Sequence, residues 1–300
     1  MLESLSTLLD LFTRPDFQAG LTAGALGLVI LLLISNEEGP APWWGEVLSL
    51  AALVAIGVVV GRRLGVGLGV LALGVGGWLL EPGRKPWARA LGGVAALTGA
   101  VMVAWRGGLS DISWLPLLTA IAIVIAGTAL SAWSIQLPHI VLGPMMAITA
   151  FGIWVTVPET EQARVLLGVA LPMAFATLAP ARARLSVGGA WALAGTVVWI
   201  VAIGGEARPA SIIGGWSALG AMAILPLVRP NAGALIRQRP FLVVGIHAVF
   251  VLIASRVIGL WDSAVVAVIA VLFVAVAALL AVGLVSKRHL LQERVGHGPE

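Results

Sequence analysis

The chain has 300 residues, of which 60% are hydrophobic and 11% are charged, with a formal net charge of +4 and a mean hydropathy of +1.04. Soluble domains are about 45–50% apolar and about 25% charged, so this composition excludes a water-soluble fold. The chain contains no cysteine, which excludes disulfides, thiolate nucleophiles and cysteine metal sites. The basic residues lie in short loops, so they carry information about membrane topology and predict no nucleic-acid partner.

The first residues of the chain are predicted to lie at the membrane surface. Leu2, Leu5, Leu9 and Phe12 recur at helical spacing, opposite polar residues. We therefore expect three regions: an interfacial amphipathic segment over 1–16, a single transmembrane domain over 17–285, and a basic cytoplasmic tail over 286–300.

Long apolar runs bounded by charged residues, glycine or proline follow in chain order. Each is about as long as the helix that crosses ~30 Å of hydrocarbon. They predict spans at 17–35, 45–60, 64–80, 88–105, 112–132, 139–157, 164–180, 186–204, 210–228, 241–260 and 263–285. The predicted fold class is all-α: a polytopic transmembrane helix bundle of ten or eleven spans.

The basic loops predict the orientation of these spans. Three of them, 181–184, 229–240 and 286–296, are separated by even numbers of spans, so the positive-inside rule places them and the C-terminus in the cytoplasm. Whether the run 64–80 crosses the membrane is less clear, because basic residues flank it on both sides. If it crosses, the chain has eleven spans and an external N-terminus; if it does not, the chain has ten. Eleven is preferred, because an apolar run of this length is costly to leave in water.

Glycine is frequent in the run 64–80, and proline interrupts a later span. The glycines favour close approach of another helix; a flexible helix beside a substrate path is the alternative. They are Gly65, Gly67, Gly69, Gly74, Gly76 and Gly77. In the later span, Pro144 predicts a kink, with Met145 and Met146 placed to border an apolar cavity and His139 near the cytoplasmic end. A plain kink packed against neighbouring helices is the other interpretation.

His247 lies near the middle of a strongly apolar run. A neutral imidazole can be satisfied there by hydrogen bonds to a neighbouring helix, and it can also serve as a proton relay or ligand contact. Ser217, in the motif GGWSALG, precedes it by one span. This Gly-x-Ser motif with a later histidine resembles the rhomboid intramembrane proteases, in which the histidine activates the serine hydroxyl. The glycine-rich surroundings of the rhomboid histidine are absent.

The remaining sequence carries few signs of catalysis. No phosphate-binding loop, HExxH motif or EF-hand loop is found, and close acidic pairs are rare. We therefore expect no cofactor and no metal site, and we favour a protein that is not an enzyme. The preferred hypothesis is a permease-like carrier or binder of an apolar or lipid-like molecule in a bacterial plasma membrane. The alternatives are a non-catalytic subunit or scaffold with membrane protein partners and, less favoured, an intramembrane serine hydrolase. The lipid bilayer is a partner in each case.

Overall fold

The computed structural model of the chain describes residues 10–34, 43–60, 64–106, 109, 114–136, 139–157, 160–178, 184–204, 212, 244–245, 247–249 and 251. Its helices are α2 (Pro15–Ile34), α3 (Trp44–Val60), α4 (Leu64–Leu79), α5 (Pro86–Arg106), α6 (Leu115–Gln136), α7 (His139–Thr156), α8 (Glu161–Leu178) and α9 (Val187–Gly204). These coincide with the first eight predicted spans to within about one helical turn. The prediction of an all-α architecture is confirmed in these ranges, which contain no β-strand.

Several of these helices have the dimensions of membrane spans. Four are long and apolar enough to cross a membrane: Pro15–Leu33, Pro86–Arg106, Leu115–Ala132 and Val187–Gly204. Shorter apolar helices occur at Trp44–Val59, Gly65–Leu79 and Val141–Thr156. Helices satisfy their own backbone hydrogen bonds, as a segment in hydrocarbon must. The predicted spans at 210–228 and 263–285, most of 241–260, and the terminal segments 1–9 and 286–300 lie outside the described residues.

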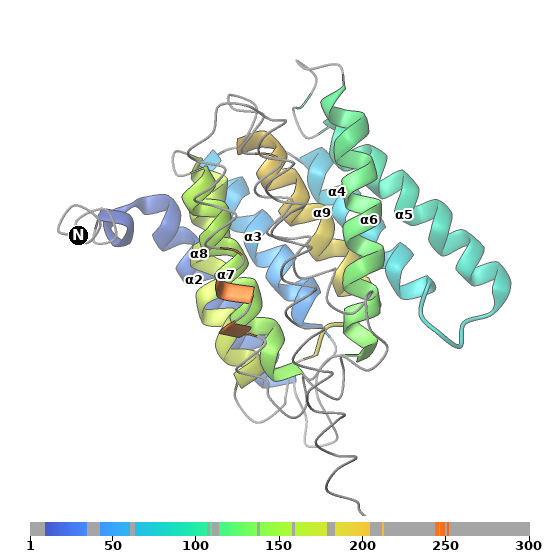
Figure 1. The fold of residues 1–300 in the computed structure, drawn as a ribbon, viewed down its shortest axis with the longest axis horizontal. Helices are drawn as coiled ribbons and strands as arrows, with labels where there is room; N and C mark the ends of the chain where they lie inside the picture. The colour runs from blue at the N-terminus through green and yellow to red at the C-terminus, as the bar shows by residue number, and fades with distance from the viewer. Residues whose placement is uncertain are drawn as a thin grey trace, which may run out of the picture.

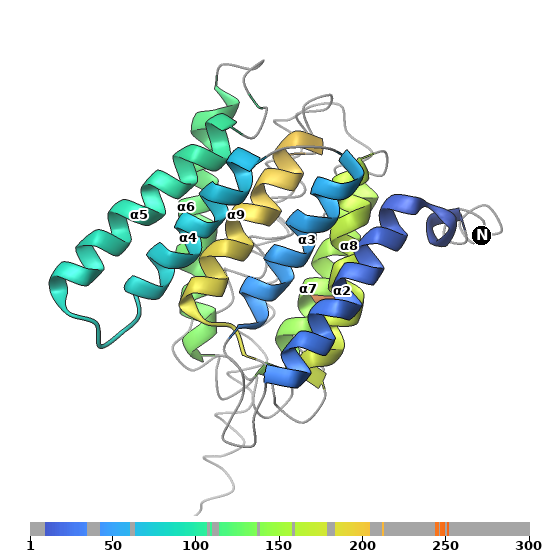
Figure 2. The ribbon, with the colours of Figure 1, turned by 180° about the vertical axis from the view of Figure 1, so that it is seen from behind.

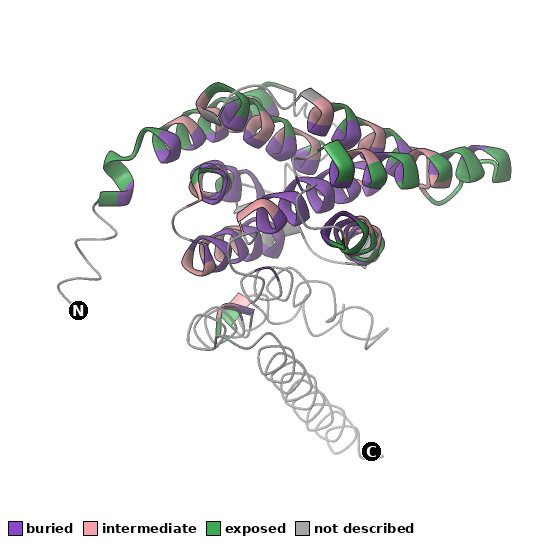
Figure 3. Cartoon of the chain, turned by 90° about the horizontal axis from the view of Figure 1, so that it is seen from above, coloured by how far each residue is buried: buried purple, intermediate pink, exposed green. Residues whose placement is uncertain are grey.

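The helices pack in layers around α9. Helices α2, α3, α4 and α5 form one layer, seen in front in Figure 2, and α8, α9 and α6 lie behind it. Helix α7 packs against α8 on the side away from this layer (Figure 1). Exposed residues line the outer side of the α2–α5 layer, whereas α9 is buried from Val187 to Ala202 (Figure 3). The apolar core therefore centres on α9, and the outer layer presents apolar side chains to its surroundings.

Contacts between distant helices fix their relative directions. Asp16 of α2 pairs with Arg164 of α8, with 2.5 Å between the carboxylate and the guanidinium Nε. One and two turns further along, Gly20 and Gly24 lie against the backbone of Val165 and Val169. Helices α2 and α8 therefore run parallel.

Helix α4 lies along α5 from Gly92 to Arg106, in the opposite direction. A Cβ atom on Gly65 would lie 2.9 Å from Cβ of Arg106, and one on Gly76 would lie 2.6 Å from the amide nitrogen of Ala96. Gly77 approaches Val187 of α9 in the same way. The prediction of close helix approach at these glycines is confirmed. Gly67 differs, since nothing lies within 4 Å of a Cβ built on it.

The starts of α5 and α9 follow local sequence signals. Gly83 has φ of +93°, the left-handed conformation that glycine adopts without strain, and the chain turns there before α5 begins at Pro86. Ser186 precedes α9, and its hydroxyl accepts a hydrogen bond from the amide of Gly189 at 2.8 Å. This serine is therefore the N-cap that starts the central helix.

Candidate functional site

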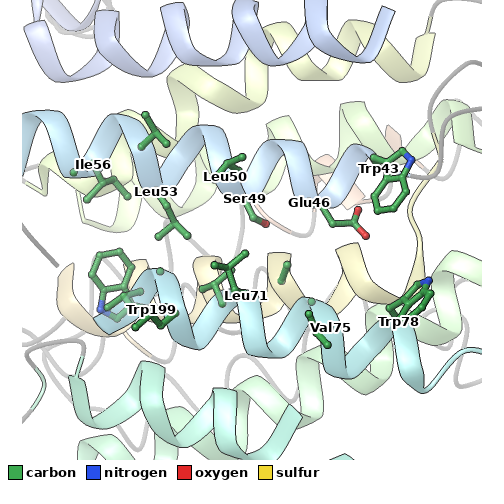
Figure 4. A pocket seen from close by; sticks show the side chains of 18 residues that line it. Trp43, Glu46, Ser49, Leu50, Leu53, Ile56, Leu71, Val75, Trp78 and Trp199 are labelled. Carbon is green, nitrogen blue, oxygen red and sulfur yellow. The ribbon is translucent and has the colours of Figure 1, made fainter. Parts of the chain in front are cut away.

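A groove of about 720 Å³ lies between α3 and α4. Both helices pack against α9 but barely against each other, so α9 forms its floor through Ala192 and Trp199. Figure 4 shows the side chains of α3 and α4 facing each other across this space. The lining residues are Trp43, Glu46, Ser49, Leu50, Leu53, Val54, Ile56, Gly57, Val66, Gly67, Leu68, Val70, Leu71, Gly74, Val75, Trp78, Ala192 and Trp199.

The groove exists because small residues face it from both sides. A Cβ atom built on Gly57 of α3 or Gly67 of α4 would meet nothing within 4 Å, and on Gly74 it would make only ordinary contacts, the nearest 3.8 Å away. Around these openings the rim is made of exposed aliphatic side chains, including Leu50 and Leu71. The groove is thus apolar and opens on the outer face of the α2–α5 layer. Its volume falls in the ~300–1,000 Å³ range of small-molecule sites.

The two ends of the groove differ in chemistry. Trp43, Trp78 and Glu46 lie at one end, and Ile56 and Trp199 lie at the other (Figure 4). The hydroxyl of Ser49 bonds its own helix, donating to the carbonyl of Gly45 at 2.8 Å. Glu46 is the one ionisable residue in the lining. The site is therefore an apolar slot with a carboxyl group at one end.

Glu46 joins three helices at this end. It lies in the first turn of α3, and its Oε1 accepts a very short hydrogen bond from the hydroxyl of Ser186. The carboxyl group occupies space that a side chain on Gly188 or Gly189 would need, and the backbone of Gly74 approaches Gly188 from α4. The Gly-Gly pair at the start of α9 therefore admits both the carboxyl group and α4. The positive end of the α9 dipole favours a carboxylate there.

Arg84, near this end of the groove, is engaged by two neighbouring side chains. The guanidinium of Arg84 lies 4.1 Å from the ring centroid of Trp78 and 3.8 Å from the carboxylate of Glu81. Among the described residues no basic side chain forms an ion pair with Glu46, and its Oε2 is buried without a hydrogen-bond partner. The mouth of the groove consequently carries a carboxyl group that forms no ion pair with a described cation.

His247 forms a hydrogen bond to α7 and is not part of the groove lining. Its Nε2 lies 2.9 Å from the hydroxyl of Thr149, and that hydroxyl donates to the carbonyl of Met145 at 2.9 Å. Because the hydroxyl has one proton, Nε2 is then the donor to the Thr149 oxygen. The imidazole is 4% exposed. A proton-relay or ligand role for His247 stays a prediction.

The other predicted site residues lie apart from the groove or outside the described residues. Pro144 is inside α7, and Met145 and Met146 belong to the buried core. Beside them the amide of Gly143 donates to the hydroxyl of Thr177 on α8, so α7 and α8 are closely packed there. His139 is the first residue of α7. Ser217, the nucleophile that the rhomboid resemblance implies, lies outside the described residues.

Sequence reasoning missed Glu46 and the groove. One signal was present: a carboxylate follows two tryptophans and a glycine and precedes a largely apolar run, WWGEVLSLAALVAIG. The two tryptophans also point differently. The indole nitrogen of Trp44 donates to the carbonyl of Met173 at 2.9 Å within the core, while Trp43 is exposed at the groove. Which sides of α3 and α4 face each other cannot be predicted from the sequence of either helix alone.

The described residues hold no cluster of three or more histidine or acidic side chains that could bind a metal ion. Comparisons with models of protein families, with curated proteins and with solved structures find no match to this chain. The site is therefore interpreted from its own geometry. An apolar slot of this volume with one carboxyl group at its end is suited to binding an apolar ligand.

Proposed function

We propose that the protein is a multi-pass membrane protein that binds or carries an apolar or lipid-like molecule in the groove between α3 and α4. The observation that carries this proposal is the groove itself: about 720 Å³, lined by aliphatic and tryptophan side chains and rimmed by exposed leucine and valine. For a ligand taken from water, burial of apolar surface against such a lining is favourable by about 25 cal/mol per Å². A plasma membrane location, with multiple passes, belongs to the same proposal.

Eleven spans fit the helix directions better than ten. Chain direction reverses at each crossing, so two helices with an odd number of crossing helices between them run parallel. Five helices, α3 to α7, separate α2 from α8, and these two run parallel. If α4 did not cross, only four crossing helices would separate them and they would run antiparallel. This parity supports α4 as a span. With the basic loop 181–184 after α8 assigned to the cytoplasm by the positive-inside rule, it also supports an external N-terminus, while the cytoplasmic C-terminus rests on that rule alone.

The function is tested by filling the groove. Quenching of tryptophan fluorescence by 1-bromododecane reports binding, because Trp43, Trp78 and Trp199 line the groove. We expect saturable quenching in phosphatidylcholine nanodiscs. Gly67→Leu places its Cβ where nothing lies within 4 Å, so the protein should fold while the affinity falls about tenfold, or ~1.4 kcal/mol.

The matched control is Gly93→Leu on α5. Its Cβ also meets nothing within 4 Å, but Gly93 is not in the groove lining, so the affinity should stay within about twofold, which is ~0.4 kcal/mol. Quenching that never saturates, or an equal loss in both variants, contradicts the proposal. In that case recovery of a stoichiometric membrane partner in mild detergent would favour the scaffold alternative.

A further inference from the structure

We propose that the groove selects a single-chain lipophilic amine, with the protonated amine at the Glu46 end and the alkyl chain along the slot toward Trp199. This inference rests on the proposed function and names the class of its ligand. Three features of the groove carry it: its length, its polarity and the charges around its mouth.

The length of the groove suits one extended alkyl chain. Glu46 and Ile56 line opposite ends, and ten residues of helix between them span about 15 Å. An extended chain of about twelve carbons has a similar length, since its carbon–carbon bonds are about 1.5 Å long. The lining between the ends is aliphatic except for Ser49, whose hydroxyl proton is donated within its own helix. A hydrocarbon chain that enters the groove therefore leaves the hydroxyl proton of Ser49 satisfied.

The charges at the mouth favour a cation over an anion or a neutral headgroup. The carboxyl group of Glu46 lines this end, and the nearby guanidinium of Arg84 is held by Glu81 and the ring of Trp78. No described basic side chain pairs with Glu46. In a poorly polarisable environment opposite charges several ångströms apart attract strongly, so an ammonium at the mouth is stabilised without direct contact to Oε2.

The tryptophans at the same end add to this preference. Indole rings attract cations over their faces, and Trp78 already holds the guanidinium of Arg84 at 4.1 Å. Trp43 is 48% exposed, and no described cation lies over its ring. An ammonium group between Glu46 and Trp43 would thus meet a carboxylate and an aromatic face together.

A purely structural role for Glu46 is the competing explanation, because its Oε1 accepts from Ser186 at the start of α9. Two variants separate the roles. Glu46→Gln keeps the size and the acceptor oxygen but removes the charge. Ser186→Ala removes the hydroxyl and leaves the carboxylate in place.

The experiment compares dodecylamine, 1-dodecanol and dodecanoate by isothermal titration at neutral pH. The full chain is held in phosphatidylcholine nanodiscs, and binding to empty nanodiscs is subtracted. We expect the wild-type protein to bind the amine at least about tenfold more tightly than the alcohol and the carboxylate most weakly. Glu46→Gln should abolish the preference for the amine over the alcohol, and Ser186→Ala should retain this preference.

Equal affinities of the wild-type protein for amine and alcohol overturn the inference but leave the proposed function standing. So does a preference for the amine that survives in Glu46→Gln. The wild-type comparison decides the matter even if the variant does not fold. If none of the three ligands binds, the proposed function and this inference fail together.

Discussion

His247 is held by one hydroxyl group of α7. Thr149 lies between the imidazole and the carbonyl of Met145, with hydrogen bonds of 2.9 Å on each side. A buried imidazole in an apolar bundle needs such a partner, because an unsatisfied polar group away from water is costly. The sequence predicts that His247 bonds a neighbouring helix, but it cannot name α7, because a pairing between residues 98 positions apart depends on tertiary packing.

Replacing this hydroxyl should destabilise the protein. Thr149→Val keeps the shape of the side chain and removes the partner of His247, so the free energy of unfolding should fall by about 1 kcal/mol, the scale of hydrogen bonds between helices in membranes. Denaturant titration in detergent micelles measures it.

Thr119→Val is the matched control for this prediction. The Thr119 hydroxyl is equally buried but has no hydrogen-bond partner among the described residues, so its loss should leave stability unchanged or slightly raised. If Thr149→Val proved as neutral as Thr119→Val, the bond to His247 would contribute nothing to stability.

At the scale of the elements, the apolar runs of the sequence predict the helices well. Length and hydropathy locate α2 to α9 because a segment in hydrocarbon must satisfy its own backbone, and the helix is the local way to do so. The faces of these helices are harder to predict. Apolar residues surround α4 on all sides, so periodicity does not distinguish its contacts with α5 and α9 from its side on the groove. Glycine spacing in 64–80 indicates close packing but does not say which glycine is left open.

The two kinds of glycine should respond oppositely to alanine. A Cβ on Gly76 would lie 2.6 Å from the amide nitrogen of Ala96 and 2.8 Å from the carbonyl oxygen of Gly92. Gly76→Ala should therefore separate α4 from α5 and destabilise the protein by about 1–3 kcal/mol. Thermal unfolding followed by circular dichroism measures the change.

Gly93→Ala, where the added methyl group meets nothing within 4 Å, provides the comparison. It should be neutral or stabilising by up to about 1 kcal/mol, because alanine is the better helix former. Equal effects at Gly76 and Gly93 would mean that the contact between α4 and α5 is not close.

For the whole molecule, the arrangement of charge in the loops and the directions of the helices lead to different topologies. The basic residues on both sides of 64–80 favour ten spans under the positive-inside rule. The parallel packing of α2 and α8 favours eleven. Charge bias is only a preference that acts during insertion. The directions of packed helices, by contrast, follow directly from how many times the chain crosses the membrane.

Single cysteines decide between these topologies, because the chain has no cysteine of its own. The substitutions Arg62→Cys and Lys85→Cys place one cysteine before α4 in the sequence and one after it. If the chain has eleven spans, a membrane-impermeant maleimide added to right-side-out vesicles should label one of these cysteines. The other should be labelled only after the vesicles are opened. Labelling of both from the same side would contradict eleven spans.

The groove has an exposed aliphatic rim on the outer face of the α2–α5 layer. This position determines which ligand concentration controls how much of the groove is filled. If this face meets lipid, the ligand enters sideways from the bilayer, after it has partitioned there. The relevant concentration is then the mole fraction of ligand among the lipids, and the aqueous concentration matters only through partitioning. Adding empty lipid at constant total ligand should therefore dilute the site and empty it, although nothing competes for binding.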